Sequence, residues 1–430
     1  MLTALLNRLR PKPTSALRPA ARSLPAAAPV AAPSAGAGAQ RPLVSAQGRL
    51  AGFQFQLGTA ALRRLQERAD GAAVAAYTGN LLGAMRLCAG RDLAALAALP
   101  ASWLARCAQD RDLAPGMHLL LQPDALCADS DAVCALITRL RRAGVRTGWD
   151  PLAEPRMPAA AGRPDFMPLR APQGADITAW QQALAAAAQR WPGVPLLLLE
   201  LPGVHVLEAV LGPPLLWAAC SIAPCAEPQR VQALPPQAQH ALRLLNRLLH
   251  DDDHGAVVAD IKADAALSLR LLTYLNSAGA SPGRELESIE QAVMLLGRDA
   301  LYRWVAQMLV RMSPPRPAAH ALQATALARA RLFELLARAA DSTNPGAAYL
   351  LGLATMLPLL LQCGIDDAAD SLHLPPAAVQ ALRGQGGPWQ PYLDLLQRLE
   401  AGDMAATEAA SAPFGGLAAV LSCWTEAWRR

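Results

Sequence analysis

The stretch from Asp264 to Gly297 constrains the fold of this 430-residue chain more than any other part of its sequence. Leucines recur there at helical spacing, at Leu267, Leu271, Leu272 and Leu275. After a Pro-Gly loop, Ile289, Val293 and Leu296 repeat the pattern. The stretch therefore predicts two helices, each with one apolar face, joined by a tight connector.

Polar and small residues mark the ends of these two predicted helices: Asp264, Asn276, Ser277, Ser288, Gln291 and Gly297. Asn276-Ser277 tolerate turn geometry, and Ser288 with Gln291 three residues later predicts a capping box. Gly297 is a helix stop. Two interpretations stay open: these residues cap and turn the chain, or they form an interaction surface where the two helices meet.

Length and composition favour two domains. One hydrophobic core rarely serves more than roughly 250–300 residues, and this chain exceeds that range. Hydrophobic residues make up 53% of the chain, which suffices for packed cores, and an aromatic content of only 4% favours helix over strand. No apolar run reaches the roughly 20 residues of a membrane-spanning helix, so we expect no membrane span.

Charge and cysteine content argue against several classes of protein. The net charge of +5 rests almost wholly on arginine, with Lys12 and Lys262 as the only lysines. A modest, scattered positive charge is weak evidence for nucleic-acid binding. The eight cysteines form no CxxC pair and lie at no zinc-ligand spacing from histidines. We therefore expect buried free thiols in a reducing cytoplasm, and no metal or cofactor.

The first 40 residues differ in composition from the rest of the chain. They are rich in Ala, Pro, Arg and Ser, with no sustained periodicity beyond Leu2–Leu9. Mitochondrial transit peptides share this composition, whereas a secretory signal would need an uninterrupted apolar core. We favour a disordered tail.

Strands and helices are expected to alternate from residue 41 to residue 228. Residues 41–57 predict a hairpin that turns near Gln47-Gly48, because Phe53, Phe55 and Leu57 alternate with glutamines. Helical stretches are expected from there to Asp112.

Five strands are predicted further along this segment, at residues 118–122, 145–150, 165–169, 195–201 and 215–222. Residues 131–143 and 177–191 predict helices, the second with Asp176 as its N-cap. The strand at 195–201 is almost entirely apolar, as in strands buried on both faces. This alternation predicts a parallel sheet or a barrel.

The Asp264–Gly297 stretch closely resembles the signature of the HDOD domain, a bacterial all-helical module related to HD-type phosphohydrolases. The matching elements are Asp264, Leu271-Leu272, Asn276-Ser277, Ser288–Ala292 and Leu295–Gly297. The pattern stays helical from residue 229 to residue 430. The resemblance implies an all-α HDOD bundle there, with a C-terminal helical extension.

The preceding half resembles an EAL domain, the barrel-type phosphodiesterase that hydrolyses cyclic di-GMP in bacteria. Residues 41–52 are similar to the opening hairpin of that family, and residues 197–217 are similar to its closing strand, helix and strand. The segment has near 190 residues, whereas a full barrel has roughly 250. The resemblance therefore implies a truncated barrel in which some strands or helices are missing.

The acids that the EAL family uses are largely replaced. Its Glu-Ala-Leu signature reads Phe55-Gln56-Leu57, its paired aspartates are reduced to Asp150, and its Lys-x-Asp strand becomes residues 166–170 without an acid. Only Glu200 stands where a family carboxylate would. Two-metal hydrolysis needs several converging carboxylates. We therefore expect no catalytic or metal-binding residue in this half, with Glu200 and Asp150 buried and hydrogen-bonded for structural reasons.

The run His250-Asp251-Asp252-Asp253-His254 contains a His-Asp pair and offers several metal ligands. It lies between two predicted helices and is followed by Gly255, whereas catalytic HD domains carry the pair on a helix. We interpret the run as a solvated turn and helix cap.

Together these features predict a multidomain, cytoplasmic bacterial signal-transduction protein without enzymatic activity. We expect a disordered tail at 1–40, a degenerate, truncated EAL-type α/β barrel at 41–228 and an all-α HDOD domain at 229–430. Protein partners are expected, cyclic di-GMP is disfavoured as a ligand, and nucleic acid is not expected.

Two alternatives stay open. One is a residual metal-dependent phosphodiesterase or phosphohydrolase that uses Glu200, Asp150 or the His250–His254 run on cyclic di-GMP or a related nucleotide. The other is a nucleotide- or nucleic-acid-binding module that uses the arginines.

Overall fold

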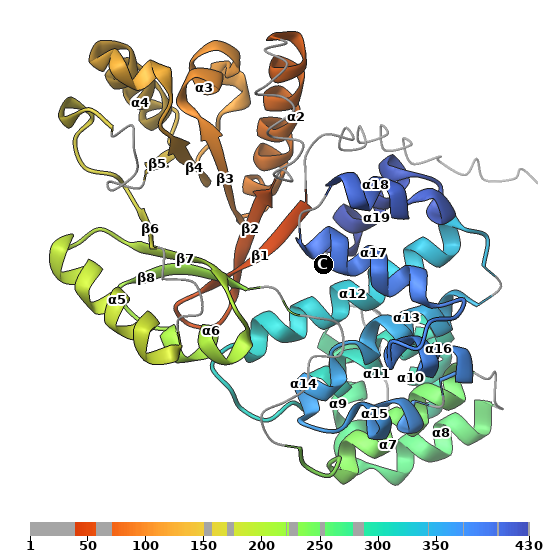
Figure 1. Ribbon diagram of the computed structural model, residues 1–430. Coiled ribbons are helices and arrows are strands. Elements are labelled where there is room, and N and C mark those ends of the chain that lie inside the picture. Colours follow the sequence, from red (N-terminus) through yellow and green to blue (C-terminus); the bar gives the residue numbers. More distant parts are fainter. Residues whose placement is uncertain are drawn as a thin grey trace, which may run out of the picture. The chain divides into compact units, whose positions relative to one another are not determined.

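The computed structural model describes residues 39–56, 71–149, 157–169, 176–220, 222, 231–249, 254–277, 288–342, 344–372, 374–401 and 404–428. All of them belong to one compact unit, Pro33–Arg430. Figure 1 shows the strands of this unit, followed along the chain by its long run of helices.

The described residues contain one sheet of eight strands: β1 (Ala39–Ser45), β2 (Leu50–Gln56), β3 (Ala94–Pro100), β4 (Met117–Gln122), β5 (Arg146–Gly148), β6 (Met167–Leu169), β7 (Leu196–Leu201) and β8 (Leu215–Cys220). The strand order is β5-β4-β3-β2-β1-β8-β7-β6. β1 is antiparallel to β2 and β8, and the other neighbouring pairs are parallel. A parallel bridge between Gly148 and Phe166 joins the two edges, so the sheet is a nearly closed barrel.

The helices of this half follow the strands: α2 (Gly71–Ala89), α3 (Ala101–Cys107), α4 (Ser130–Arg142), α5 (Ile177–Arg190) and α6 (Val204–Val210). Aspartates begin two of them. The side chain of Asp129 accepts hydrogen bonds from the first amides of α4, and Asp176 accepts one from Ala179 N at 2.8 Å. The predicted cap at Asp176 and the predicted hairpin of β1 and β2 are both confirmed.

The sequence-based prediction was wrong for β3, which lies in a region expected to be helical up to Asp112. Its sequence, AALAALP, has little intrinsic preference for a strand. It nevertheless pairs with β2 and β4 and is buried at most positions. The small alanine side chains fit a strand enclosed on both faces, so tertiary packing overrides local propensity here.

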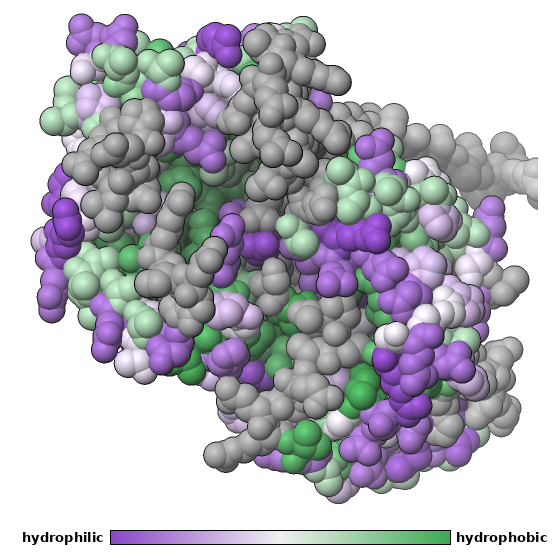
Figure 2. All heavy atoms as spheres, viewed as in Figure 1, coloured by the Kyte–Doolittle hydropathy of each residue, from purple (hydrophilic) through white to green (hydrophobic). Residues whose placement is uncertain are grey.

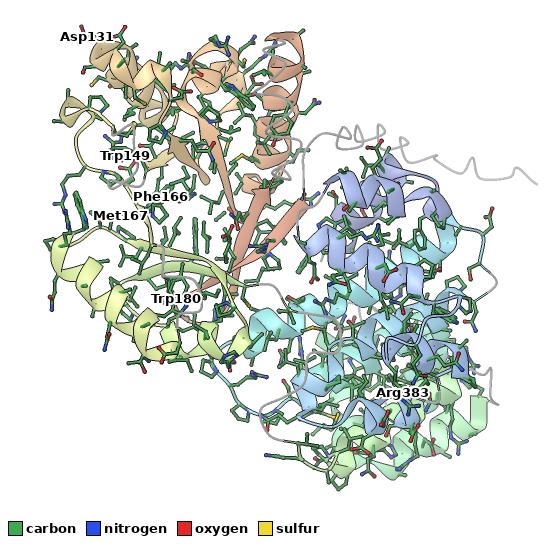
Figure 3. The ribbon with its side chains drawn as sticks, viewed as in Figure 1. Asp131, Trp149, Phe166, Met167, Trp180 and Arg383 are labelled. Atoms are coloured by element: carbon green, nitrogen blue, oxygen red, sulfur yellow. The ribbon has the colours of Figure 1, made fainter. Side chains whose placement is uncertain are left out.

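The expected shortening does not remove a strand from the barrel. Instead β5 and β6 have three residues each, and their connection contains, among its described residues, only the short 3-10 helix Ala159–Ala161. Figure 3 places Trp149, Phe166 and Met167 close to where these two strands meet. The strands of the barrel are therefore shortest where β5 and β6 meet.

The second half is helical throughout its described residues: α7 (Pro236–Leu249), α8 (His254–Ala263), α9 (Ala265–Ser277), α10 (Ile289–Leu296), α11 (Arg298–Arg311), α12 (Ala319–Ala339), α13 (Pro345–Ala354), α14 (Leu357–Leu361), α15 (Ile365–Ser371), α16 (Pro376–Leu382), α17 (Gln390–Ala401), α18 (Met404–Ala410) and α19 (Leu417–Ala427). α12 and α13 pack so closely that a Cβ at Gly352 would lie 2.5 Å from the backbone oxygen of Arg329. Gly352 is therefore required by close helix packing.

Several clusters of buried hydrophobic residues organise the unit. A small cluster that includes Leu43, Leu96, Phe166, Leu197 and Trp217 joins residues of four strands, β1, β3, β7 and β8, and the segment entering β6. A much larger cluster runs from β1, β7, β8, α5 and α6 through α7 to α19. In the view of Figure 2, hydrophobic side chains gather among the strands, whereas hydrophilic side chains spread over the lower helices.

Within the described part of the chain, every helix is too short or too polar to cross a lipid bilayer.

Candidate functional site

Active sites of parallel α/β barrels lie at the carboxyl ends of their strands, so a candidate site is expected at this end of the barrel. β2 ends there at Gln56, which has no carboxylate to offer. Trp149 follows β5 and is buried. Asp150 and Arg170 lie outside the described residues.

Glu200 is the one predicted carboxylate of this end that the structure describes. It lies in β7, where the pairing with β8 is irregular, and its φ of 64° is in the left-handed region. Its side chain is exposed. The expectation that Glu200 is buried for structural reasons was therefore wrong, because the irregular backbone at this position turns the side chain into solvent.

A buried arginine lies near Glu200. Arg41, in β1 opposite Gln54 of β2, is only 7% exposed. Burial lowers the pKa of the Arg41 guanidinium, and the nearby Glu200, Cys220 and Glu400 act in the opposite direction. Arg41 would therefore repel a cation held beside Glu200.

The other candidate ligands that the structure describes do not come together at one point either. Among the described residues, no three His, Cys, Asp or Glu side chains are placed to hold a metal ion. His254 is the exposed first residue of α8, and His250 to Asp253 lie outside the described residues.

The predicted HDOD residues lie at helix ends. Asp264 Oδ1 accepts a hydrogen bond from Leu267 N at 3.0 Å and caps α9, and Ser288 Oγ accepts one from Gln291 N at 3.2 Å and caps α10. Gly297, with φ 72°, separates α10 from α11. The capping interpretation is thus confirmed for Asp264, Ser288 and Gly297.

The interaction interpretation of the same residues stays a prediction. Gln291 is exposed on α10, where a partner could reach it. Asn276 and Ser277 are the last residues of α9, and their side chains lie outside the described part.

Sequence reasoning missed a set of exposed apolar side chains on these helices. Six large hydrophobic residues of the described chain are exposed, and four of them belong to α9 and α10: Leu269, Tyr274, Met294 and Leu295. The exposed fractions of Leu269 and Met294 are 68% and 67%. The sequence does indicate exposed apolar residues on α10, since Met294 and Leu295 continue its apolar run beyond the buried face set by Ile289 and Val293.

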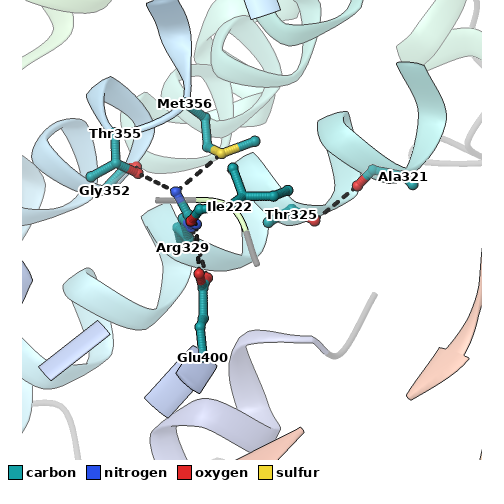
Figure 4. Close-up of polar contacts among 8 residues, drawn as sticks. All are labelled: Ile222, Ala321, Thr325, Arg329, Gly352, Thr355, Met356 and Glu400. Atoms are coloured by element: carbon teal, nitrogen blue, oxygen red, sulfur yellow. Dashed lines mark hydrogen bonds and ion pairs between the residues drawn. The ribbon is translucent and has the colours of Figure 1, made fainter. Parts of the chain in front are cut away.

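Sequence reasoning also missed a buried polar cluster between α12, α13 and α17 (Figure 4). The side chain of Arg329 is fully buried and donates to both carboxylate oxygens of Glu400, at 2.9 and 2.7 Å. Its Nη1 donates to Thr355 Oγ1 at 3.3 Å and approaches Met356 Sδ at 3.1 Å, and its Nη2 donates to the backbone oxygen of Ile222. Arg329 thereby connects three helices to the segment that follows β8.

A second ion pair fixes α6 to the start of α12. Arg316 donates to both carboxylate oxygens of Glu208, at 2.7 and 2.9 Å, and Ala318 N donates to the same carboxylate at 3.1 Å. Nearby, Ala321 N donates to the backbone oxygen of Gly48 in the β1–β2 turn. These contacts tie the sheet to the helices through polar groups as well as through the shared core.

Comparisons with known proteins identify part of the chain. Residues 234–365 match the model of the HDOD domain. The uncharacterized protein YuxH of Bacillus subtilis is 31% identical over 36% of this chain and 39% of its own length. The cyclic di-GMP phosphodiesterase CdgJ of Vibrio cholerae is 27% identical over 40% of each chain. The chain thus matches about two fifths of the length of these relatives.

Solved structures give weaker similarity. An EAL domain protein from Listeria monocytogenes is 8% identical over 44% of this chain and 88% of its own, with a TM-score of 0.33. The EAL domain of Xanthomonas citri FimX in complex with c-diGMP is 12% identical over 43% of this chain and 84% of its own, also with a TM-score of 0.33. The barrel is defined by its strand order and by the bridge that joins its two edges. The predicted fold class is confirmed in these terms: a nearly closed α/β barrel precedes an all-α part that carries, at residues 234–365, an HDOD domain.

Proposed function

We propose that this chain is a regulatory protein of cyclic di-GMP signalling that has no catalytic activity of its own. In this proposal the barrel at residues 41–228 is a degenerate EAL-like domain, and the HDOD half at 229–430 binds a protein partner. The printed name of CdgJ, a cyclic di-GMP phosphodiesterase, supports the signalling context. The free thiols of the seven described cysteines suit a reducing cytoplasm.

The proposal of inactivity rests mainly on one observation: the buried Arg41 guanidinium interacts with Glu200, the carboxylate that a metal site would need. Phosphodiester hydrolysis with two metal ions needs several carboxylates around them. At the carboxyl end of the barrel, Glu200 contributes one exposed carboxylate, and the buried Arg41 interacts with it electrostatically. Coulomb repulsion from Arg41 disfavours divalent cations there. Cyclic di-GMP turnover by the purified protein is therefore not expected.

A second observation supports a protein partner for the HDOD half. When a partner covers exposed apolar side chains, it removes them from water, and this burial favours binding. α9 and α10 carry most of the large exposed apolar residues of the described chain, including Met294 and Leu295 next to each other. A partner with an apolar contact surface fits these helices better than a nucleic acid, which would need clustered positive charge.

The partner surface can be tested with a matched pair of variants. Met294→Glu places a charge on α10, and Leu87→Glu places one on α2, where Leu87 is 51% exposed. Both side chains are solvent-exposed, so neither variant is expected to unfold the protein. Proteins cross-linked to the wild-type chain in its native host are expected to be retained by Leu87→Glu and lost from Met294→Glu. Equal retention by the two variants would contradict the assignment of α10 to the partner surface.

A further inference from the structure

Three arginines converge on one carboxylate where α11 packs against α12. Arg303 Nη2 and Arg338 Nη2 both donate to Glu334 Oε1, each at 2.8 Å, and Arg331 Nη1 donates to Glu334 Oε2 at 3.0 Å. Arg303 belongs to α11, and the other three residues belong to α12. Because all three guanidinium groups touch the same carboxylate, they lie close enough to one another, within about 6 Å, to repel each other.

The charges of this cluster do not cancel. Three guanidinium groups and one carboxylate leave a surplus of two positive charges. The exposed Asp299 lies one turn before Arg303 on α11 and acts on the neighbouring Tyr302. Within the described part of the chain, however, Glu334 is the only acid that forms an ion pair with the three arginines.

The guanidinium groups are accessible, whereas the carboxylate is almost buried. The side chains of Arg303, Arg331 and Arg338 are 33%, 28% and 51% exposed, and that of Glu334 is 5% exposed. Each arginine uses one nitrogen for Glu334 and makes no other hydrogen bond to a described residue. The remaining nitrogens of Arg303 and Arg331 reach the surface. Glu334 therefore holds the three groups from the protein side and leaves their outer N–H donors available to a ligand.

We propose that Arg303, Arg331 and Arg338 bind one doubly charged oxyanion of the phosphate class. Guanidinium groups match phosphate oxygens in geometry, and arginine clusters are a recurrent means of recognising phosphoryl groups. A phosphate monoester carries close to two negative charges at neutral pH, which matches the surplus of the cluster, whereas one carboxylate would leave a charge over. Glu334 fixes the three side chains before the ligand arrives, so less side-chain entropy is lost on binding.

Selenate, a tetrahedral dianion with an anomalous scatterer, tests the site in crystals of the full chain. An anomalous peak is expected in contact with at least two of the three guanidinium groups. Selenate that binds elsewhere on the protein and leaves this cluster empty would overturn the proposal.

Binding in solution is measured by phosphorus NMR at constant ionic strength, with inorganic phosphate and with a terminally capped phosphoserine peptide. Arg331→Gln is expected to weaken the binding of both probes by about tenfold or more. Arg311→Gln removes an exposed arginine of the same helix as Arg303 and is expected to leave binding unchanged. Tighter binding of the peptide would assign the site to phosphorylated protein, and tighter binding of phosphate would assign it to the free ion.

Equal binding by Arg331→Gln, Arg311→Gln and the wild type, or no binding of either probe to the wild type, would overturn the proposal. If Arg331→Gln does not fold, Arg338→Gln replaces it in the same comparison, because Arg338 is the most exposed of the three arginines.

Discussion

Removing the carboxylate of Glu400 is expected to destabilise the protein strongly. The Arg329 side chain has no exposed surface and that of Glu400 is 12% exposed, so their ion pair lies almost entirely out of water. Glu400→Gln keeps the shape of the side chain but leaves the Arg329 guanidinium without a counter-charge. Glu400 also attracts the positive charge of Arg41, so the substitution removes this attraction as well.

The size of the effect follows from this burial. Removing one partner of a buried ion pair costs about 3–5 kcal/mol, because the remaining charge stays buried and unpaired. The remaining contacts of Arg329, to Ile222 O, Thr355 Oγ1 and Met356 Sδ, are to neutral groups and do not compensate a charge. We therefore expect the free energy of unfolding to fall by about 3–5 kcal/mol in Glu400→Gln.

Urea denaturation followed by circular dichroism measures this change. Asp366→Asn is a suitable control, because the Arg383–Asp366 pair has side chains that are 42% and 63% exposed and is expected to contribute about 1 kcal/mol or less. Arg383 is labelled in Figure 3. The double variant Arg329→Met/Glu400→Leu removes both charges and is expected to recover much of the loss. A loss in Glu400→Gln as small as that of the control would refute the reasoning.

Two further changes test other parts of the fold. Gly48 has φ 71°, and a Cβ there would lie 1.6 Å from Pro317 O, so Gly48→Ala is expected to lower the melting temperature more than Gly193→Ala, where φ is 78° and nothing lies within 4 Å. Burial lowers the pKa of His118 from 6.5 to about 4, so the unfolded chain takes up a proton in this window that the native state does not. The stability that neutral His118 contributes is complete above about pH 6.5 and is lost as the pH falls to about 4, by about 3 kcal/mol in total. His118→Phe is expected to remove this part of the pH dependence in urea titrations at successive pH values; an unchanged pH profile would contradict it.

Local signals in the sequence predicted local structure well. The caps at Asp176 and Ser288 depend on a side chain and an amide three residues away, so both partners are visible in the sequence. The β1–β2 hairpin was visible for the same reason, since alternation and a glycine turn lie within a few residues.

Features that depend on distant partners were not predictable. β3 is a strand because β2 and β4 flank it, although its alanines favour a helix. Arg329 lies on the apolar side of α12, which was a signal of a buried charge, but its partner Glu400 is 71 residues away. The exposure of Glu200 follows from an irregularity in the β7–β8 pairing, and no local sequence pattern indicates this irregularity.

The central claim, that this chain regulates without catalysing, is tested most directly by incubating the purified full chain with cyclic di-GMP and Mn²⁺ or Mg²⁺. No linear dinucleotide is expected to form, and Glu200→Ala is expected to behave as the wild type does. Turnover by the wild type that disappears in Glu200→Ala would contradict the account, because it would show that Glu200 supports a working metal site beside Arg41.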